Sequence, residues 1–294
     1  MSTGFTDDNN VLGVYISGYH ITTLIVNLHS GAVLKSSYQR KAINSRGAAN
    51  EIIKACGEVI QHALTSNNST IGRIGIAMPG PFDYSQGISY IKNNKKHAAL
   101  YGLNVKQLLA DKLNLPTTAI CMLNDAAAFL KGEVFAGVAK GYQRVIGIAI
   151  GTGLGTAKLA GGHAEDADLW QSPFVDGVAE DYISERWLLK RYYELSGINV
   201  VNIQELAAFH NKSTTVKNVF KEFANNLALF TANFIRATDP EMVVISGNIA
   251  ATAADYFLPQ FKTQLVKLGI DVPVCVSKLN SDSVLIGAAT CWLD

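Results

Sequence analysis

The feature that most constrains the fold is an apolar strand that runs directly into a glycine-rich turn within residues 145–156. The turn reads Gly151-Thr152-Gly153, and the sequence after it continues as a second strand. Glycine lets the main chain turn sharply and approach a ligand closely, so backbone N–H groups at such a tip can surround phosphate oxygens. A dinucleotide fingerprint would open a helix instead. The pattern predicts a β-hairpin whose tip holds phosphate, and a hairpin that binds nothing is the alternative.

A similar pattern occurs near the N-terminus, where residues 12–18 align with residues 146–152. Each segment is an alternating apolar strand with glycine in its second position and a turn of small residues after it. A further strand, at residues 21–28, follows the first turn. Self-similarity at this large spacing indicates two related halves rather than an array of short repeats. Two unrelated hairpins that look alike are the alternative.

The rest of the sequence alternates strands with helices. Hydrophobic spacing predicts helices at residues 48–66, 104–113, 178–195, 215–238, 249–256 and 283–292, and another that begins at residue 126. Short apolar runs predict strands at residues 71–77, 118–123, 242–246 and 273–277. Strands that alternate with helices indicate an α/β architecture with two sheets.

Composition narrows the class of protein. The chain has 294 residues, of which 48% are hydrophobic and 17% charged, enough apolar material for one large or two medium domains. A net charge of +1 gives no electrostatic basis for binding nucleic acid or an anionic membrane. No apolar run is long enough to span a bilayer, and residues 1–8 lack the features of a signal peptide. We expect a cytoplasmic protein.

The cysteines carry little information about chemistry. They are scattered, with no C-x-x-C or C-x-C pair, at Cys56, Cys121, Cys275 and Cys291. Neither a disulfide framework nor a structural zinc site is predicted from this spacing.

Asn124-Asp125 is the strongest candidate for catalysis. The pair follows a predicted strand and precedes a predicted helix, and α/β sheets bind ligands at the carboxyl ends of their strands. The alternative is that Asp125 only caps the helix. The neighbouring amide of Asn124, which could orient a hydroxyl group, and the phosphate loop 25 residues further on favour the catalytic interpretation.

Two other strand ends are candidate ligand sites. Pro79-Gly80-Pro81 fixes the chain in one path after a strand, which suits a rigid wall for a small polar ligand, or a plain structural turn. Gly247-Asn248 follows residues 242–246 and opens a helix whose N-terminus could receive a nucleotide, although many α/β turns look like this.

Together these motifs resemble the ROK family of sugar kinases, repressors and uncharacterised reading frames, within the actin and hexokinase superfamily. The resemblance rests on residues 75–81, 123–126, 151–155 and 239–248, which occur in the family's order and spacing. It extends from residue 11 to residue 289, nearly the whole chain.

The resemblance implies two actin-like, ribonuclease H-like α/β domains that flank a cleft. We expect a small domain of residues 1–122 plus 284–294, and a larger one of residues 123–283. The family implies ATP with Mg²⁺ and transfer of the γ-phosphate to a sugar hydroxyl. It also implies a homodimer.

Site residues follow from the same resemblance. Asp125 matches the catalytic base. Sugar contacts are implied at Asn124, Pro79, Gly80, Asp168 and Glu180, and nucleotide contacts at Gly18, Gly151, Thr152, Gly153, Gly247 and Asn248. Magnesium would be held through ATP, with Asp125 as a further candidate ligand.

Three departures from the family pattern matter. The opening loop reads D-x-G-G-T in the family, but Tyr15 and Tyr19 replace its aspartate and threonine here, and a phenol is a poor ligand for a hard cation. The zinc motif C-x-C-G-x-x-G-C is absent. The G-E-I-G-H segment is replaced by residues 167–171, where Asp168 could stand in for the glutamate, whereas Glu180 matches a later sugar-binding glutamate. The alternatives are a solvated loop for Asp168 and a helix-start carboxylate for Glu180.

The leading hypothesis is an ATP-dependent kinase of a hexose or an N-acyl amino sugar, glucokinase-like. The second is a catalytically impaired relative that binds sugar and has a regulatory or scaffolding role, motivated by Tyr15 and Tyr19. A DNA-binding repressor fits poorly, because repressors of the family carry a helix-turn-helix segment ahead of the first strand and only about ten residues precede it here.

Overall fold

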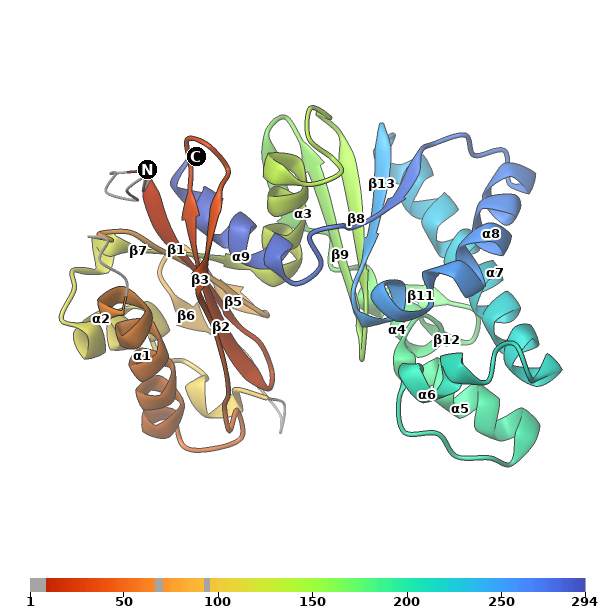
Figure 1. Cartoon of the computed structure of the whole chain (residues 1–294), viewed down its shortest axis with the longest axis horizontal. Helices are drawn as coiled ribbons and strands as arrows, with labels where there is room; N and C mark the ends of the chain where they lie inside the picture. Colours follow the sequence, from red (N-terminus) through yellow and green to blue (C-terminus); the bar gives the residue numbers. More distant parts are fainter. Residues whose placement is uncertain (1–8, 67–70, 93–95, 294) are drawn as a thin grey trace. The chain divides into compact units, whose positions relative to one another are not determined.

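The computed structural model describes residues 9–66, 71–92 and 96–293. The chain forms two compact units, Met1–Ala136 with Ser281–Asp294 and, separately, Gly137–Asn280. Each unit contains one five-stranded sheet with helices packed on it (Figure 1). The predicted α/β fold with two sheets is confirmed. The signal-peptide prediction falls on residues 1–8, outside the described part.

The first unit is built on the sheet β3-β2-β1-β4-β7. Its strands are β1 (Asn10–Ile16), β2 (His20–Asn27), β3 (Val33–Ala42), β4 (Ile74–Met78) and β7 (Ile120–Asn124), beside the small hairpin β5 (Phe82–Asp83) and β6 (Ile88–Ser89). Its helices are α1 (Ala49–Thr65), α2 (Val105–Leu113), α3 (Asp125–Ala136) and α9 (Asp282–Ala289), with short 3-10 turns at Ala98–Leu100, Thr117–Ala119 and Thr290–Trp292.

Successive side chains of β1 point to opposite faces of this sheet. Leu12, Val14 and Ile16 point into the core that α1 and α2 cover, together with apolar residues of β4 and β7. Gly13 and Tyr15 point to the other face, where α9 packs. Because β1, β4 and β7 are mutually parallel, their carboxyl ends meet at one edge of the sheet.

Glycines allow α9 to pack very closely on its neighbours. A Cβ at Gly75 would lie 1.9 Å from the carbonyl oxygen of Ala288, and one at Gly132 of α3 would lie 1.9 Å from that of Ser283. Helix α3 is thus packed against α9 (Figure 1). This contact places α3 in the first compact unit, and the chain passes from one unit to the other at residues 136/137 and 280/281. The domain bounds expected from the family resemblance, at 122/123 and 283/284, stay a prediction.

The second unit is built on the sheet β10-β9-β8-β13-β14. Its strands are β8 (Val145–Ile150), β9 (Leu154–Ala160), β10 (His163–Asp166), β13 (Met242–Ser246) and β14 (Val274–Val276), with a small pair β11 (Pro173–Phe174) and β12 (Gly177–Val178). Its helices are α4 (Ala179–Tyr182), α5 (Glu185–Ser196), α6 (Ile203–Ala208), α7 (Thr214–Thr238) and α8 (Asn248–Lys267), and a 3-10 turn spans Leu169–Gln171.

The two sheets share one topology. Each has an antiparallel three-stranded meander, β1-β2-β3 or β8-β9-β10, followed by two parallel strands, β4 and β7 or β13 and β14. The two similar hairpins occupy the same place in this order. The repeat read from the sequence therefore corresponds to a repeated sheet topology.

The second unit also departs from the predicted helices. The helix expected at residues 178–195 is interrupted, because the Ser184 hydroxyl accepts the Trp187 N–H at 3.3 Å and starts a new helix there. Helix α8 extends past the expected end at residue 256, with a kink at Ala253 and Pro259 inside it. Helices α7 and α8 meet through aromatic side chains, including Phe223 and Phe257 at a centroid distance of 5.4 Å.

Across the residues described, none of the helices combines the length and the apolar character needed to cross a bilayer.

Candidate functional site

The first group of candidate residues lies at the carboxyl edge of the first sheet. Asn124 is the last residue of β7 and lies beside Met78, the last residue of β4. Asp125 follows as the first residue of α3. Strand ends of this kind position ligand-binding side chains in open α/β sheets.

Asn124 caps helix α3. Its side-chain oxygen accepts the backbone N–H groups of Ala126 at 2.7 Å and Ala127 at 3.2 Å. These are donors at the start of a helix that need an external acceptor. The structural alternative for Asp125, a helix cap, is therefore assigned to its neighbour.

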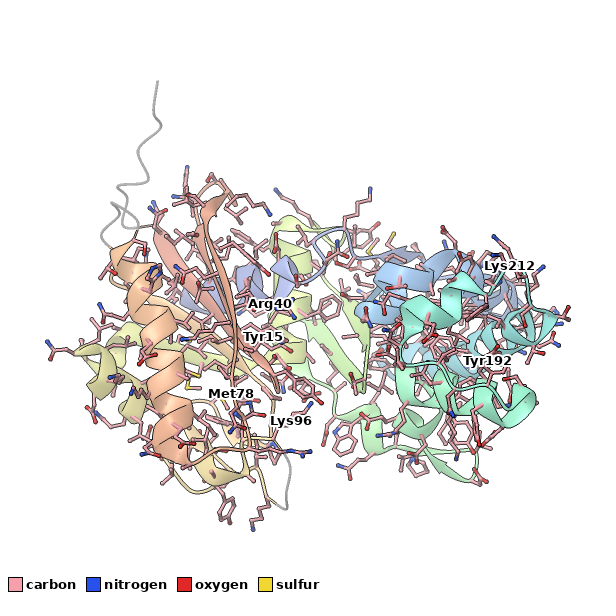
Figure 2. The ribbon with its side chains drawn as sticks, turned by 60° about the horizontal axis from the view of Figure 1, so that its bottom comes forward. Tyr15, Arg40, Met78, Lys96, Tyr192 and Lys212 are labelled. Atoms are coloured by element: carbon pink, nitrogen blue, oxygen red, sulfur yellow. The ribbon has the colours of Figure 1, made fainter. Side chains whose placement is uncertain are left out.

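Tyr15 reaches Asp125 across the sheet. Its hydroxyl donates a hydrogen bond to the Asp125 carboxylate at 3.2 Å, although β1 and β7 are two strand spacings apart, about 10 Å. The buried side chain of Ala77 on β4, which lies between them, is small enough for the ring to pass over it. Burial first, and then the charge of Asp125, raises the pKa of Tyr15 well above its ordinary value. Tyr15 and Met78 are labelled in Figure 2.

Tyr84 connects the proline–glycine turn to Asn124. Its hydroxyl donates to the Met78 carbonyl at 2.9 Å and accepts from the Asn124 amide at 3.2 Å. A Cβ at Gly80 would lie 3.2 Å from this hydroxyl. The structure therefore brings Gly80 and Asn124 together through a tyrosine that the sequence analysis did not select. The phenyl ring stacks on Phe82 at a centroid distance of 5.1 Å.

The second group of candidates lies at the tip of the β8–β9 hairpin. The predicted hairpin is present, with residues 151–153 as its turn. Glu180 of α4 accepts the Leu154 N–H at 3.0 Å, and a Cβ at Gly153 would lie 2.5 Å from the same carboxylate oxygen. Arg186 lies 3.5 Å from the other oxygen. A side chain at position 153 would therefore displace the Glu180 carboxylate from this place.

Gly247 lies against the end of β8 next to the hairpin turn, and Asn248 follows it. Gly247 has φ +96°, and a Cβ there would lie 2.3 Å from the Ile150 carbonyl oxygen. The two glycine motifs of the second unit are therefore in contact. Asn248 begins α8, and its side-chain oxygen accepts from Gln204 of α6 at 3.1 Å. No sequence motif indicated Gln204.

Asp168 makes local contacts. Its carboxylate accepts the Trp170 indole N–H at 2.7 Å, and its own N–H donates to Asp166 at 2.8 Å. The segment is fixed to β9, because Thr156 accepts the Leu169 N–H at 3.1 Å. None of these contacts involves the glycine hairpin tip.

Gly18 lies in the turn between β1 and β2. It belongs to the first unit, as Asn124 does. Its carbonyl accepts the Ser45 hydroxyl at 2.6 Å. The side chain of Lys96 passes directly over it.

The described residues contain no cluster of ligands that would hold magnesium without a nucleotide. At the position where a metal-organising carboxylate was expected, Tyr15 instead directs a hydroxyl hydrogen at Asp125. Within residues 9–66, 71–92 and 96–293, no three His, Cys, Asp or Glu side chains gather as a metal-binding group.

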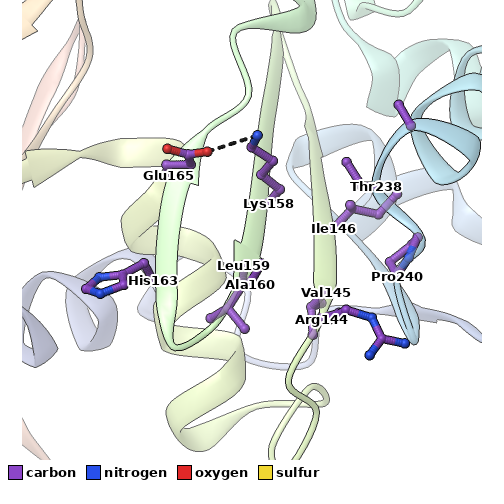
Figure 3. A pocket seen from close by; sticks show the side chains of 11 residues that line it. Arg144, Val145, Ile146, Lys158, Leu159, Ala160, His163, Glu165, Thr238 and Pro240 are labelled. Carbon is purple, nitrogen blue, oxygen red and sulfur yellow. Dashed lines mark ion pairs between the residues drawn. The ribbon is translucent and has the colours of Figure 1, made fainter.

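A pocket of about 290 Å³ lies elsewhere in the second unit (Figure 3). Arg144, Val145, Leu159 and Ala160 line its part near the open end of the β8–β9 hairpin, and the ion pair of Lys158 with Glu165, at 2.9 Å, lies at its rim. Val145 pairs with Leu159 five residue steps from the tip, about 17 Å away. The pocket is separate from the glycine turn.

Comparison with known proteins now adds to this geometry. The chain is 28% identical over 230 residues to an N-acetylgalactosamine kinase from Shewanella sp. (strain ANA-3), covering 65% of this chain and 72% of that protein. It is 24% identical over 262 residues to a xylose repressor from Bacillus subtilis (strain 168), covering 81% of this chain and 64% of the repressor.

The fold is also found among solved structures. A ROK family glucokinase from Streptomyces griseus, solved with glucose and AMPPNP, superposes with a TM-score of 0.75 at 21% identity, covering 96% of this chain and 98% of that one. The sequence model of the ROK family matches residues 11–166 and 175–294 of this chain. The chain therefore belongs to the ROK family.

Proposed function

We propose that this protein is an ATP-dependent kinase of a hexose or an N-acyl amino sugar, with Asp125 as the general base. The observation that carries the proposal is that Asn124, and not the carboxylate next to it, accepts the first N–H groups of α3 in the two hydrogen bonds described above. Because Asn124 satisfies the N–H groups at the start of α3, the Asp125 carboxylate is not needed as a helix cap. Asp125 directly follows the end of β7, the place in an α/β sheet where a substrate hydroxyl can approach a side chain.

The names of similar proteins support this reaction class. The Shewanella relative is named an N-acetylgalactosamine kinase, and the Streptomyces structure is that of a glucokinase with glucose and AMPPNP bound. One acts on an N-acyl amino sugar and the other binds a hexose with an ATP analogue. Both substrate classes are therefore kept in the proposal.

The proposed reaction transfers one phosphoryl group. A sugar hydroxyl oxygen attacks the γ-phosphorus of ATP, the bond from that phosphorus to the β–γ bridging oxygen breaks, and ADP leaves. The hydroxyl proton passes to the carboxylate of Asp125. Such a step depends mainly on positioning and charge neutralisation, and the base needs only hydrogen-bond reach to the attacking hydroxyl.

The first unit supplies the proposed sugar contacts at Asn124, Pro79 and Gly80. Asn124 and Gly80 lie at the Tyr84 hydroxyl, Pro79 directly precedes Gly80 in the chain, and we add Tyr84 to the set. Its hydroxyl, which already bridges two strand ends, can orient the Asn124 amide toward a ligand. Asp168 and Glu180 remain proposals from the family match.

The second unit supplies the proposed nucleotide contacts. Gly151, Thr152 and Gly153 form the turn of a hairpin, and Gly247 contacts Ile150 just before that turn. We propose that the turn residues bind phosphate while Gly247 and Asn248 bind the adenosine side. Gly18 is proposed as the equivalent turn of the first unit. Magnesium enters this proposal as part of the nucleotide.

A coupled ADP-release assay over hexoses and N-acetylated amino sugars tests the proposal. We expect turnover on at least one sugar, and loss of turnover in Asp125→Asn. Stabilisation of the wild type by MgATP, measured as a rise in Tm, tests nucleotide binding separately. A wild type that turns over none of these sugars would contradict the proposed activity.

A second function, a sugar-binding protein with impaired catalysis, is favoured by one contact. The Tyr15 hydroxyl occupies an oxygen of the same carboxylate that would accept the proton, and a repressor is among the relatives. Under this alternative the wild type binds sugar without turnover, and Tyr15→Asp gains activity. Activity in the wild type that Tyr15→Asp does not increase would rule against it.

A further inference from the structure

A segment outside the family match forms one wall of a second pocket in the second unit. The match to the ROK family ends at residue 166 and resumes at residue 175. Five residues of the intervening segment, with parts of β9, β10 and α7, line a pocket of about 450 Å³, a volume typical of small-molecule sites. They are Ala167, Leu169, Ser172, Pro173 and Phe174. The family match therefore does not account for this pocket.

Hydrogen bonds hold this segment in place. The N–H groups of Ala167 and Leu169 donate to the carbonyl and the hydroxyl of Thr156 on β9, at 2.9 and 3.1 Å. At the other end, the Ser172 carbonyl accepts the Ala179 N–H of α4 at 3.0 Å. The Ser172 hydroxyl donates to the Leu169 carbonyl at 2.7 Å, which closes the turn between the two ends. The wall is thus formed before a ligand arrives, which lowers the entropy cost of binding.

Three phenylalanine rings give the pocket an apolar side. Phe174 belongs to the segment, and Phe230 and Phe234 lie on α7. The ring centroids of Phe174 and Phe234 each lie 6.4 Å from that of Phe230, and all three side chains are buried. Packing therefore fixes the rings, and the apolar surface that they present suits the hydrocarbon part of a ligand.

The rim of the pocket carries an ion pair. The Lys158 ammonium lies 2.9 Å from the Glu165 carboxylate, and both residues line this pocket as well as the one in Figure 3. Their side chains are 43% and 65% exposed, so a ligand can reach both. A second carboxylate, that of Asp166, also lines the pocket and accepts the Asp168 N–H at 2.8 Å. The lining thus offers charges of both signs beside an apolar wall.

We propose that this pocket binds a free α-amino acid with a large apolar side chain, of the size of phenylalanine. An α-amino acid carries an ammonium and a carboxylate on one carbon atom, which matches the adjacent opposite charges of Glu165 and Lys158. Its side chain lies against the three phenylalanine rings. Neither Asp125 nor the turn at residues 151–153 lines the pocket, so the site goes beyond the proposed function and can be tested without nucleotide or sugar.

Three related compounds separate the parts of the ligand. L-phenylalanine carries both charges, phenethylamine lacks the carboxylate, and 3-phenylpropionate lacks the ammonium. Their affinities for the full chain are measured by ligand-detected NMR titration. We expect L-phenylalanine to bind about tenfold more tightly than either of the others, the scale of one charge-assisted hydrogen bond. No binding of L-phenylalanine, or equal affinity for all three compounds, would overturn the proposal.

Variants of the ion pair should give crossed effects. Lys158→Met should weaken binding of L-phenylalanine and 3-phenylpropionate about tenfold and leave phenethylamine unchanged. Glu165→Gln should weaken binding of L-phenylalanine and phenethylamine and leave 3-phenylpropionate unchanged. Lys190→Met is the matched control, because Lys190 also pairs with a glutamate, Glu194 at 3.7 Å, but does not line the pocket. Equal losses for all three compounds in both variants would indicate damage to the fold and overturn the charge match.

Ala237→Phe tests the position of the site. Ala237 is exposed and lines both pockets, so the larger side chain fills the space without disturbing the core. It should remove binding of all three compounds, and wild-type affinity in this variant would overturn the site. Sugar turnover without binding of L-phenylalanine would refute this site and support the kinase. Binding of L-phenylalanine without sugar turnover would do the reverse.

Discussion

The contact between Gly247 and the β8–β9 hairpin makes a sharp prediction about stability. Gly247 combines a positive φ of +96° with a backbone atom, the Ile150 oxygen, 2.3 Å from where a Cβ would lie. Gly141 in the same unit has nearly the same φ, +92°, but no atom within 4 Å of its Cβ position. Alanine at the two positions therefore separates the cost of the dihedral angle from the cost of the overlap.

The magnitudes follow from these two terms. A non-glycine residue at such a dihedral angle costs about 1–3 kcal/mol, which both variants incur. Overlap with a backbone that cannot move freely adds about 1–3 kcal/mol, which only Gly247→Ala incurs. We expect Gly141→Ala to lower the free energy of unfolding by about 1–3 kcal/mol and Gly247→Ala by about 2–6 kcal/mol.

Urea unfolding followed by tryptophan fluorescence measures the difference. Trp187 is a reporter in the second unit, because it is buried and its ring lies 6.2 Å from that of Phe223. Trp292 reports on the first unit, where its indole N–H donates to the Ile74 carbonyl at 3.2 Å. Equal losses in the two variants, or no loss in Gly247→Ala, would refute the close contact with the hairpin.

Three further predictions concern single residues. Tyr15→Phe removes the hydroxyl that donates to Asp125, and it should lower the free energy of unfolding by about 0.5–1.5 kcal/mol, measured in urea. An unchanged free energy of unfolding would show that this hydrogen bond does not stabilise the protein. Glu180→Ala leaves the Leu154 N–H without its acceptor and should cost about 1–3 kcal/mol, most of it recovered in Glu180→Gln; equal losses would contradict this. Burial lowers the pKa of His97 despite the opposing hydrogen bond to the Ser17 carbonyl. The unfolded chain therefore binds a proton first as the pH falls through about 6.5, so stability present above that pH is lost below it. Unfolding midpoints between pH 8 and pH 5 should show a smaller loss in His97→Asn, since asparagine tolerates the φ of +65° at this position.

Local pattern predicted most of the elements. The helix expected at residues 215–238 is found as Thr214–Thr238, and the strand at residues 242–246 as Met242–Ser246. Both segments have a strong hydrophobic periodicity and clear ends. The backbone of Asp239, which ends α7, adopts the left-handed conformation. The hairpin at residues 145–156 and its N-terminal counterpart are also present.

The boundary between the two units depends on contacts that local pattern does not contain. Helix α3 belongs to the first unit because Gly132 meets α9 about 150 residues later. Neither helix carries a signal for the other in its own sequence.

Site residues that act across long separations were missed for the same reason. Tyr84 joins Met78 to Asn124, and Lys96 covers Gly18. The available signal for Tyr84 was its place in the sequence, as an aromatic residue three positions after Pro81. That Asn124 caps α3 became evident only from its hydrogen bonds to Ala126 and Ala127.

The central proposal is that Asp125 takes the proton from a sugar hydroxyl during phosphoryl transfer. The most direct measurement is the single-turnover rate of Asp125→Asn with a sugar that the wild type phosphorylates, alongside calorimetric affinities for that sugar and for MgATP. We predict a loss of at least about 100-fold in rate, the lower end for a general base, with both affinities within a few-fold of wild type. A rate near that of the wild type would contradict the role of Asp125.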